Sequence, residues 1–197
     1  MDHPLQCRCG TVKGYVSRAG MTKRAICYCR DCQAYAHFLG DADKVLDGDG
    51  GTDVVATLPI NVRFVEGQHA LACMSLSPRG LLRWYSSCCQ TPIGNTPRNF
   101  KMAYVGLVHN CLGNAAALQQ SFGPVQVRVN TKSAKHPVDS TPLSSLTTIL
   151  MLMKTLARAR LQGSYKETPF FISETGAPIV QPRVLTQAER EQVSRAV

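Results

Sequence analysis

The sequence lacks the long apolar runs and the basic blocks that mark two common classes of protein. Nowhere do about 18 consecutive apolar residues occur, which argues against a membrane-spanning helix. Aromatic residues make up 7% of the chain and do not alternate with lysine and arginine, so the stacking surface of a single-strand nucleic-acid binder is also missing. The start of the chain has no positive charge followed by an apolar stretch, and we therefore expect a cytoplasmic protein.

The net charge of +9 is spread along the whole chain. Residues 1–98 have 11 Lys and Arg against 8 Asp and Glu, and residues 99–197 have 11 against 5. No block of consecutive basic residues forms a nucleic-acid footprint. This distribution predicts a solvated surface that favours small anionic ligands, with neither nucleic acid nor a membrane as partner.

The 197 residues, of which 44% are hydrophobic, are enough for one ordinary globular domain. Residues 1–98 contain short segments of strand character between turns rich in Gly and Asp, and this pattern predicts a small β domain. Residues 99–197 are expected to form an extension whose long helix, at about 142–162, packs on the first part. The predicted fold is mainly β in its first half and α+β overall.

The helix prediction rests on end signals and on apolar spacing. Thr141 can cap the start, Pro142 suits the first helical position and Gly163 can end the helix. Apolar residues recur at helical spacing, and they are Leu143, Leu146, Ile149, Leu150, Met153, Leu156 and Ala157. Packing of this face on a sheet is favoured over an amphipathic membrane helix. A capping signal in "TQAEREQVSRAV" predicts a further short helix.

Nine cysteines stand out in a chain of this composition. A reducing cytosol keeps thiols free, and an odd number leaves at least one cysteine unpaired. A disulfide framework is therefore not expected. Metal binding or thiol chemistry is the leading explanation.

Seven of the cysteines form three clusters in the sequence. Cys7 and Cys9 are separated by one residue, Cys88 and Cys89 are adjacent, and Cys27, Cys29 and Cys32 form a Cys-x-Cys-x-x-Cys run. Thiolates one or two residues apart in a tight turn can reach the same zinc ion. A structural zinc takes four protein ligands, whereas a reactive zinc keeps three and leaves one position open. Counting ligands predicts two sites, with the first pair completed by the Cys88 and Cys89 pair and the three-cysteine run forming an open site.

Other interpretations of the cysteines remain open at this point. Cys29 and Cys32 can be read as a redox Cys-x-x-Cys pair, although no parallel βαβ pattern surrounds them, or as inert thiols. His37 follows closely enough to approach a metal. Cys73 and Cys111 lie in apolar runs and are predicted to be buried small hydrophobic residues.

Three ordered motifs resemble those of the glutathione-dependent formaldehyde-activating enzyme family, which includes the relatives of centromere protein V and has an Mss4-like β fold. The motifs are "LQCRCGTV", "ICYCRDCQ" and "LLRWYSSCCQTPIGN", and they cover the first half of the chain. The second half resembles an uncharacterised bacterial branch of the same group. The resemblance implies a structural zinc on Cys7, Cys9 and two later cysteines, and an exchangeable zinc on Cys27, Cys29 and Cys32.

The chain departs from the family pattern in the third motif. Ser86 stands where the family has the first cysteine of this segment, and Gln90 replaces the glycine after Cys89. Cys88 is expected to substitute as a ligand. Adjacent cysteines can share a metal only through an unusual backbone turn, so the alternatives for the fourth position are water, Ser86 or no ligand at all.

Two functions from different classes follow from these motifs. The resemblance implies a carbon–sulfur lyase, similar to S-hydroxymethylglutathione synthase, in which one or two zinc ions are bound and an open tris-cysteine zinc binds glutathione or another small anionic thiol. The alternative is a non-catalytic zinc module for structure or interaction. Arg30, Asp31 and Gln33 adjoin the ligands and are the candidate substrate contacts. The cations Arg24 and Arg30 are expected to offset the negative charge of the site.

Overall fold

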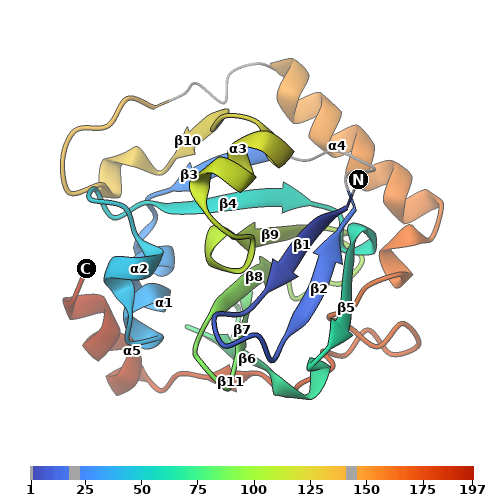
Figure 1. Cartoon of the computed structure of the whole chain (residues 1–197), viewed down its shortest axis with the longest axis horizontal. Helices are drawn as coiled ribbons and strands as arrows, with labels where there is room; N and C mark the ends of the chain where they lie inside the picture. Colours follow the sequence, from blue (N-terminus) through green and yellow to red (C-terminus); the bar gives the residue numbers. More distant parts are fainter. Residues whose placement is uncertain (1, 18–22, 141–145) are drawn as a thin grey trace.

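An eight-stranded sheet runs through the centre of the molecule (Figure 1). The computed structural model describes residues 2–17, 23–140 and 146–197, and the side chains of residues 146–152 are not described. The strand order in the sheet is β10-β3-β4-β9-β8-β7-β6-β11. The bounds are β3 (Lys23–Cys27), β4 (Thr52–Thr57), β6 (Leu71–Ser75), β7 (Leu82–Ser86), β8 (Pro92–Thr96), β9 (Val105–Val108), β10 (Val127–Val129) and β11 (Arg183–Val184).

Strands β3 to β9 of this sheet pair antiparallel, whereas β10 and β11 pair in parallel with β3 and β6. Parallel pairing requires a long connection, and both edge strands come from the second half of the chain, many residues after the strands with which they pair. The expectation of an α+β fold overall is confirmed, and its sheet is large and takes strands from both halves of the chain.

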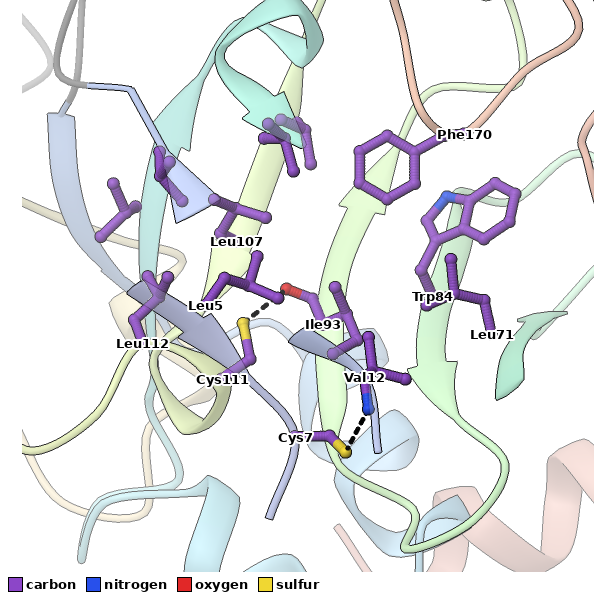
Figure 2. Close-up of a cluster of buried hydrophobic side chains, with 14 of the residues drawn as sticks. Leu5, Cys7, Val12, Leu71, Trp84, Ile93, Leu107, Cys111, Leu112 and Phe170 are labelled. Carbon is purple, nitrogen blue, oxygen red and sulfur yellow. Dashed lines mark hydrogen bonds between the residues drawn. The ribbon is translucent and has the colours of Figure 1, made fainter. Parts of the chain in front are cut away.

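A second, three-stranded antiparallel sheet lies in front of the large one in Figure 1. It consists of β1 (His3–Gln6), β2 (Lys13–Val16) and β5 (Val62–Glu66). Leu5 and Val12 of the small-sheet segment pack in one cluster with Ile93 and Leu107 of the large sheet, as Figure 2 shows. The main hydrophobic core therefore lies between the two sheets.

Helices cover the flanks of the large sheet. Helix α1 (Arg30–Phe38) packs beside α5 (Gln187–Arg195). Tyr35 of α1 and Leu39, its C-cap, join Met74 of β6 in a second buried cluster. The other helices are α2 (Ala42–Val45), α3 (Ala115–Phe122) and α4 (Leu146–Leu161). Short 3-10 turns are η1 (Pro59–Asn61), η2 (Gln68–Ala70), η3 (His109–Cys111), η4 (Thr131–Ser133) and η5 (Ser164–Lys166). Of the helices in the described ranges, none is both long and apolar enough to cross a bilayer.

Residues after position 98 enter both the large sheet and the main core. Strand β9 lies between β4 and β8. Phe170 and Phe171 pack against Trp84, with ring centroids 5.2 and 6.1 Å apart. The division of the chain into residues 1–98 and 99–197 stays a prediction.

The predicted long helix corresponds to α4 (Leu146–Leu161). Gly163, with a φ of +74°, follows its end as expected, whereas the predicted start at Thr141 and Pro142 lies outside the described residues. The predicted apolar face is wrong at the described end, because Met153 is 60% exposed and Ala159 is buried instead. The chain turns back at Gly163, and Ser164 Oγ donates to Ala159 O, so the turn covers this other side of the helix.

The short terminal helix is confirmed as α5. Thr186 is its N-cap, and its hydroxyl accepts a hydrogen bond from the backbone of Glu189. The Glu189 side chain accepts one in return from the Thr186 backbone, which completes the predicted capping box.

Candidate metal centres

The first candidate centre forms where β3 passes into α1. Cys27 is the last residue of β3, Cys29 is the N-cap of α1 and Cys32 lies in its first turn. The strand end, one intervening residue and the helix start bring the three Sγ atoms within 4.8 Å of one another. Cys32 is buried and the other two are half-buried. We call this group the three-cysteine cluster.

Each sulfur of the three-cysteine cluster receives a hydrogen bond from a nitrogen. Asn130 Nδ2 donates to Cys27 Sγ over 3.4 Å, and the Cys32 backbone N–H donates to Cys29 Sγ over 3.4 Å. Arg83 Nη1 donates to Cys32 Sγ over 3.8 Å. Donors directed at sulfur favour the thiolate over the thiol, which is the form that binds a metal.

The three thiols affect one another's ionisation. Hydrogen bonds from Cys29 and Cys32 lower the pKa of the Cys27 thiol. The contact with Cys27 is the main cause of a raised pKa at Cys29 and, together with burial, at Cys32. Cys27 is therefore the first of the three to ionise.

Arg83 is the cation beside this cluster. Its side chain is 2% exposed, and its Nη1 also donates to Asn95 Oδ1 over 3.1 Å. Its guanidinium carbon lies 5.1 Å from the centroid of the Tyr35 ring. Among the described residues, no carboxylate lies within ion-pair distance of Arg83. Burial lowers the pKa of the guanidinium, but the Cys32 sulfur more than offsets this and the pKa is raised.

The cations expected from the sequence are placed elsewhere. Arg24 forms a buried ion pair with Asp53, with Nη2 and Oδ2 2.7 Å apart, so its charge is already compensated. Arg30 is exposed. The expectation that these two arginines offset the sulfur charge is wrong for Arg24, which is paired with Asp53, and stays a prediction for Arg30. The sheet places a further cation, Arg83, at Cys32.

The second candidate centre, the four-cysteine cluster, joins two distant turns. Cys7 Sγ lies 3.6 Å from Cys9 Sγ and 3.9 Å from Cys88 Sγ, and Cys9 Sγ lies 3.2 Å from Cys88 Sγ. Cys89 Sγ lies 3.9 Å from Cys88 Sγ, and all four sulfurs are within 4.8 Å of one another. A tetrahedron with zinc–sulfur bonds of about 2.3 Å has sulfur–sulfur edges of about 3.8 Å, so the group has the size that one ion needs.

Two tight backbone turns hold the four-cysteine cluster. In the first, Gly10 has a φ of +79° and its N–H donates to Cys7 O, while the Val12 N–H donates to Cys7 Sγ over 3.2 Å (Figure 2). In the second, Gln90 has a φ of +55° and its N–H donates to Ser86 O. This is the unusual turn that adjacent cysteines require, and it brings Cys88 and Cys89 into one group.

Ser86, at the position of the missing cysteine, is fully buried. Its Oγ accepts a hydrogen bond from the Thr91 N–H over 3.1 Å and lies 3.2 Å from Cys89 Sγ. Burial raises the pKa of Cys89, but hydrogen bonds with Ser86 and Thr91 prevail and lower it to about 5. Ser86 thus contacts the Cys89 sulfur and lowers its pKa, and Cys88 is the fourth cysteine of the group.

The three candidate substrate contacts have different surroundings. Arg30 and Asp31 are exposed and line a cavity of about 300 Å³ with Arg190, Ser194 and Val197. Gln33 is 2% exposed, and its Nε2 donates to Tyr28 O over 2.8 Å and to Ser133 O over 2.9 Å. The structure therefore uses Gln33 to tie the start of α1 to the loop around η4 and does not turn it toward the cavity.

The remaining thiols and the nearby histidine lie outside both clusters. Cys73 and Cys111 are 3% and 1% exposed, as predicted, and burial raises the pKa of both, that of Cys73 to about 12. Cys111 donates to two backbone carbonyls, one of which, that of Ile93, is drawn in Figure 2. His37 lies in the last turn of α1 and does not belong to the ligand groups found among the described residues.

Sequence reasoning missed two residues that contact the three-cysteine cluster, Arg83 and Asn130. Arg83 is the arginine of the motif "LLRWYSSCCQTP", and its position in that motif was the signal that could have found it. Asn130 lies 103 positions from Cys27 in a segment with no motif, so no signal in the sequence pointed to it.

A model of one protein family matches residues 2–181, and that family is described as a family of unknown function (DUF6151). No curated protein and no solved structure matches the chain. Both cysteine clusters lie within the matched residues, whereas α5 lies beyond them.

Proposed function

The chain belongs to the DUF6151 family, and we propose that it is a zinc protein with one closed structural site and one open site that binds a thiol. The four-cysteine cluster would hold the structural ion. The three-cysteine cluster would hold the second ion and leave one coordination position for a ligand. The Mss4-like identity of the fold is part of the same proposal.

The grouping of Cys27, Cys29 and Cys32 beside a buried arginine carries the proposal. Three sulfurs within 4.8 Å, each with a nitrogen donor, suit a thiophilic ion such as zinc. A redox pair needs no third sulfur and no buried cation. The donor set therefore favours metal binding over disulfide exchange.

The chemistry of a tris-thiolate zinc points to a thiol as the fourth ligand. When bound, such a zinc supplies a weak Lewis acid that lowers the pKa of a thiol ligand, and its net negative charge makes it a poor activator of water. The resemblance to glutathione-dependent formaldehyde-activating enzymes suggests carbon–sulfur lyase chemistry. In that reaction the sulfur of glutathione bonds to the carbon of formaldehyde, and the carbonyl oxygen takes a proton.

The chain provides groups that suit a small anionic thiol. Arg30, which follows Cys29 directly, and Arg190 line the same cavity, and their charges would attract the carboxylates of glutathione. Asp31 in the same cavity would accept a hydrogen bond from the ligand's ammonium group. Gln33 would keep the turn that holds the three sulfurs in place.

Metal analysis combined with isothermal titration calorimetry tests the proposal. We expect two zinc ions per chain, one of which is lost on mild chelation, and we expect the zinc-loaded protein to bind glutathione. A single, tightly held zinc and no heat of binding on addition of glutathione would overturn the proposed lyase activity and favour a non-catalytic zinc module. Formation of S-hydroxymethylglutathione from glutathione and formaldehyde, measured by NMR, then tests the reaction itself.

A further inference from the structure

Arg83 is a buried cation that lacks the usual kind of partner. Its side chain is 2% exposed and no described carboxylate pairs with it. Asn95 Oδ1 and the Tyr35 ring hold the guanidinium in place, but neither carries a negative charge. A buried charge needs an opposite charge close by, and the group that the structure places next to Arg83 is the sulfur of Cys32, 3.8 Å away, which would become a thiolate as a metal ligand.

The charge balance of the three-cysteine cluster depends on this residue. Three thiolates and one divalent ion sum to −1, and the guanidinium of Arg83 brings the sum to zero. We propose that Arg83 makes the open position of the three-cysteine cluster selective for anionic ligands, thiolates in particular, by cancelling the excess charge of the site. This inference rests on the proposed function, because it requires a metal with an open position.

The four-cysteine cluster shows the opposite arrangement. Four thiolates and one divalent ion sum to −2. Arg8, which stands between Cys7 and Cys9 in the sequence, has a side chain that is 55% exposed and is paired with Asp41. Its other contact is with the carbonyl oxygen of Cys89, not with a sulfur. A buried cation is thus associated with the cluster that has a free coordination position, and not with the cluster whose ligands are complete.

The neutral donor Asn130 separates the effect of charge from the effect of hydrogen bonding. Like Arg83, it donates to one sulfur of the cluster, but it carries no charge and is exposed. Its φ of +58° is a conformation that glycine adopts readily, so Asn130→Gly removes the amide without straining the backbone. This variant is the matched control for the loss of Arg83.

The test uses the full chain loaded with Co²⁺, whose visible spectrum reports the ligands of the open site. 2-Mercaptoethanol, which binds as a thiolate, and imidazole, which binds as a neutral ligand, are each titrated into the wild type and four variants. Arg83→Met and Arg83→Gln remove the charge, Arg83→Lys keeps it, and Asn130→Gly is the control. Circular dichroism verifies that each variant is folded.

We expect Arg83→Met and Arg83→Gln to weaken thiolate binding about tenfold or more, because a unit charge within a few ångströms acts strongly at a partly buried site. Imidazole binding should change by less than about threefold, since imidazole brings no charge. Arg83→Lys should stay within about threefold of the wild type for both ligands. Asn130→Gly should affect the two ligands equally.

Two failures are distinguishable. If the wild type shows no spectral change with either ligand, the open site is absent and the proposed function fails. If the wild type binds both ligands, but loss of the charge weakens the binding of 2-mercaptoethanol and of imidazole equally, the site is open and the role of Arg83 is overturned. If both charge-removing variants are unfolded, Arg83→Lys decides, and a tenfold loss of thiolate binding in that folded variant would contradict a role based on charge.

Discussion

The side-chain amide of Asn130 donates a hydrogen bond to the sulfur of Cys27, although 103 positions separate the two residues in the sequence. Strand β10 pairs in parallel with β3 so that Val129 lies opposite Cys27, and Asn130 is the next residue. The register of one strand pair therefore brings the second half of the chain to the three-cysteine cluster. The site cannot be assembled by the cysteine motif alone.

Replacement of Cys9 by serine should destabilise the whole protein. Cys9 Sγ lies 3.2 Å from Cys88 Sγ, and a metal held by these turns would link positions 79 residues apart. Loss of a ligand should remove the ion and several kcal/mol of folding free energy, so that the variant is insoluble on expression. Lys13→Ala, a substitution in the adjoining strand β2, should keep both metals. A Cys9→Ser protein with an unchanged melting temperature would show that no structural metal binds there.

Replacement of Cys32 by serine should have the opposite effect. The three-cysteine cluster connects neighbouring residues, so loss of its metal should leave the fold largely intact. We expect metal analysis to show loss of the weakly held ion only, with a circular dichroism spectrum like that of the wild type and a lower melting temperature, because the buried Arg83 loses the Cys32 sulfur. Retention of full zinc by Cys32→Ser, or a Cys29–Cys32 disulfide that cycles with reductant, would favour the redox interpretation instead.

Replacement of Gln90 by glycine should stabilise the protein. Gln90 has a φ of +55°, which disfavours a side chain, and it occupies the position where the resembling family has glycine. We expect the free energy of unfolding to rise by about 0.5–1 kcal/mol. Gln90→Val should lower it, because a β-branched side chain tolerates positive φ poorly. Thermal denaturation of the wild type, Gln90→Gly and Gln90→Val measures these changes. A lower melting temperature for Gln90→Gly than for the wild type would show that the backbone at Gln90 is not strained.

Replacement of Asp53 by alanine should leave the buried charge of Arg24 without its carboxylate. The Arg24 side chain is 9% exposed, and its Nε and Nη2 both donate to the Asp53 carboxylate. Removal of one partner from such a pair costs about 3–5 kcal/mol. Glu66→Gln breaks the exposed Lys13–Glu66 pair and should cost less than about 1 kcal/mol. Chemical denaturation measures both, and equal losses would show that burial does not matter here.

The sequence was sufficient to predict the three-cysteine cluster, because ligands one to three residues apart share a turn whatever the rest of the fold does. The four-cysteine cluster was predicted by counting ligands, and its two turns are brought together by the fold. The sequence also indicated that Cys88 would substitute for the cysteine missing at Ser86. The structure places Cys88 in the four-cysteine cluster and gives Ser86 a supporting contact with Cys89.

The charge environment of the clusters could not be predicted in the same way. Arg24 and Arg30 are close to the cysteines in sequence, yet cross-strand register pairs Arg24 with Asp53 and places Arg83 at Cys32. Contacts of this kind depend on which strands become neighbours. Periodicity and spacing carry no information about that choice.

Both outer strands of the eight-stranded sheet, β10 and β11, come from the second half of the chain. During synthesis from the N-terminus, β3 and β6 are complete long before the segments that cover them emerge from the ribosome. Each would present a row of unpaired backbone groups in the meantime, and such edges promote aggregation of nascent chains. Productive folding therefore waits for the segments that carry β10 and β11, and truncations that remove β11 should aggregate even though every cysteine is present.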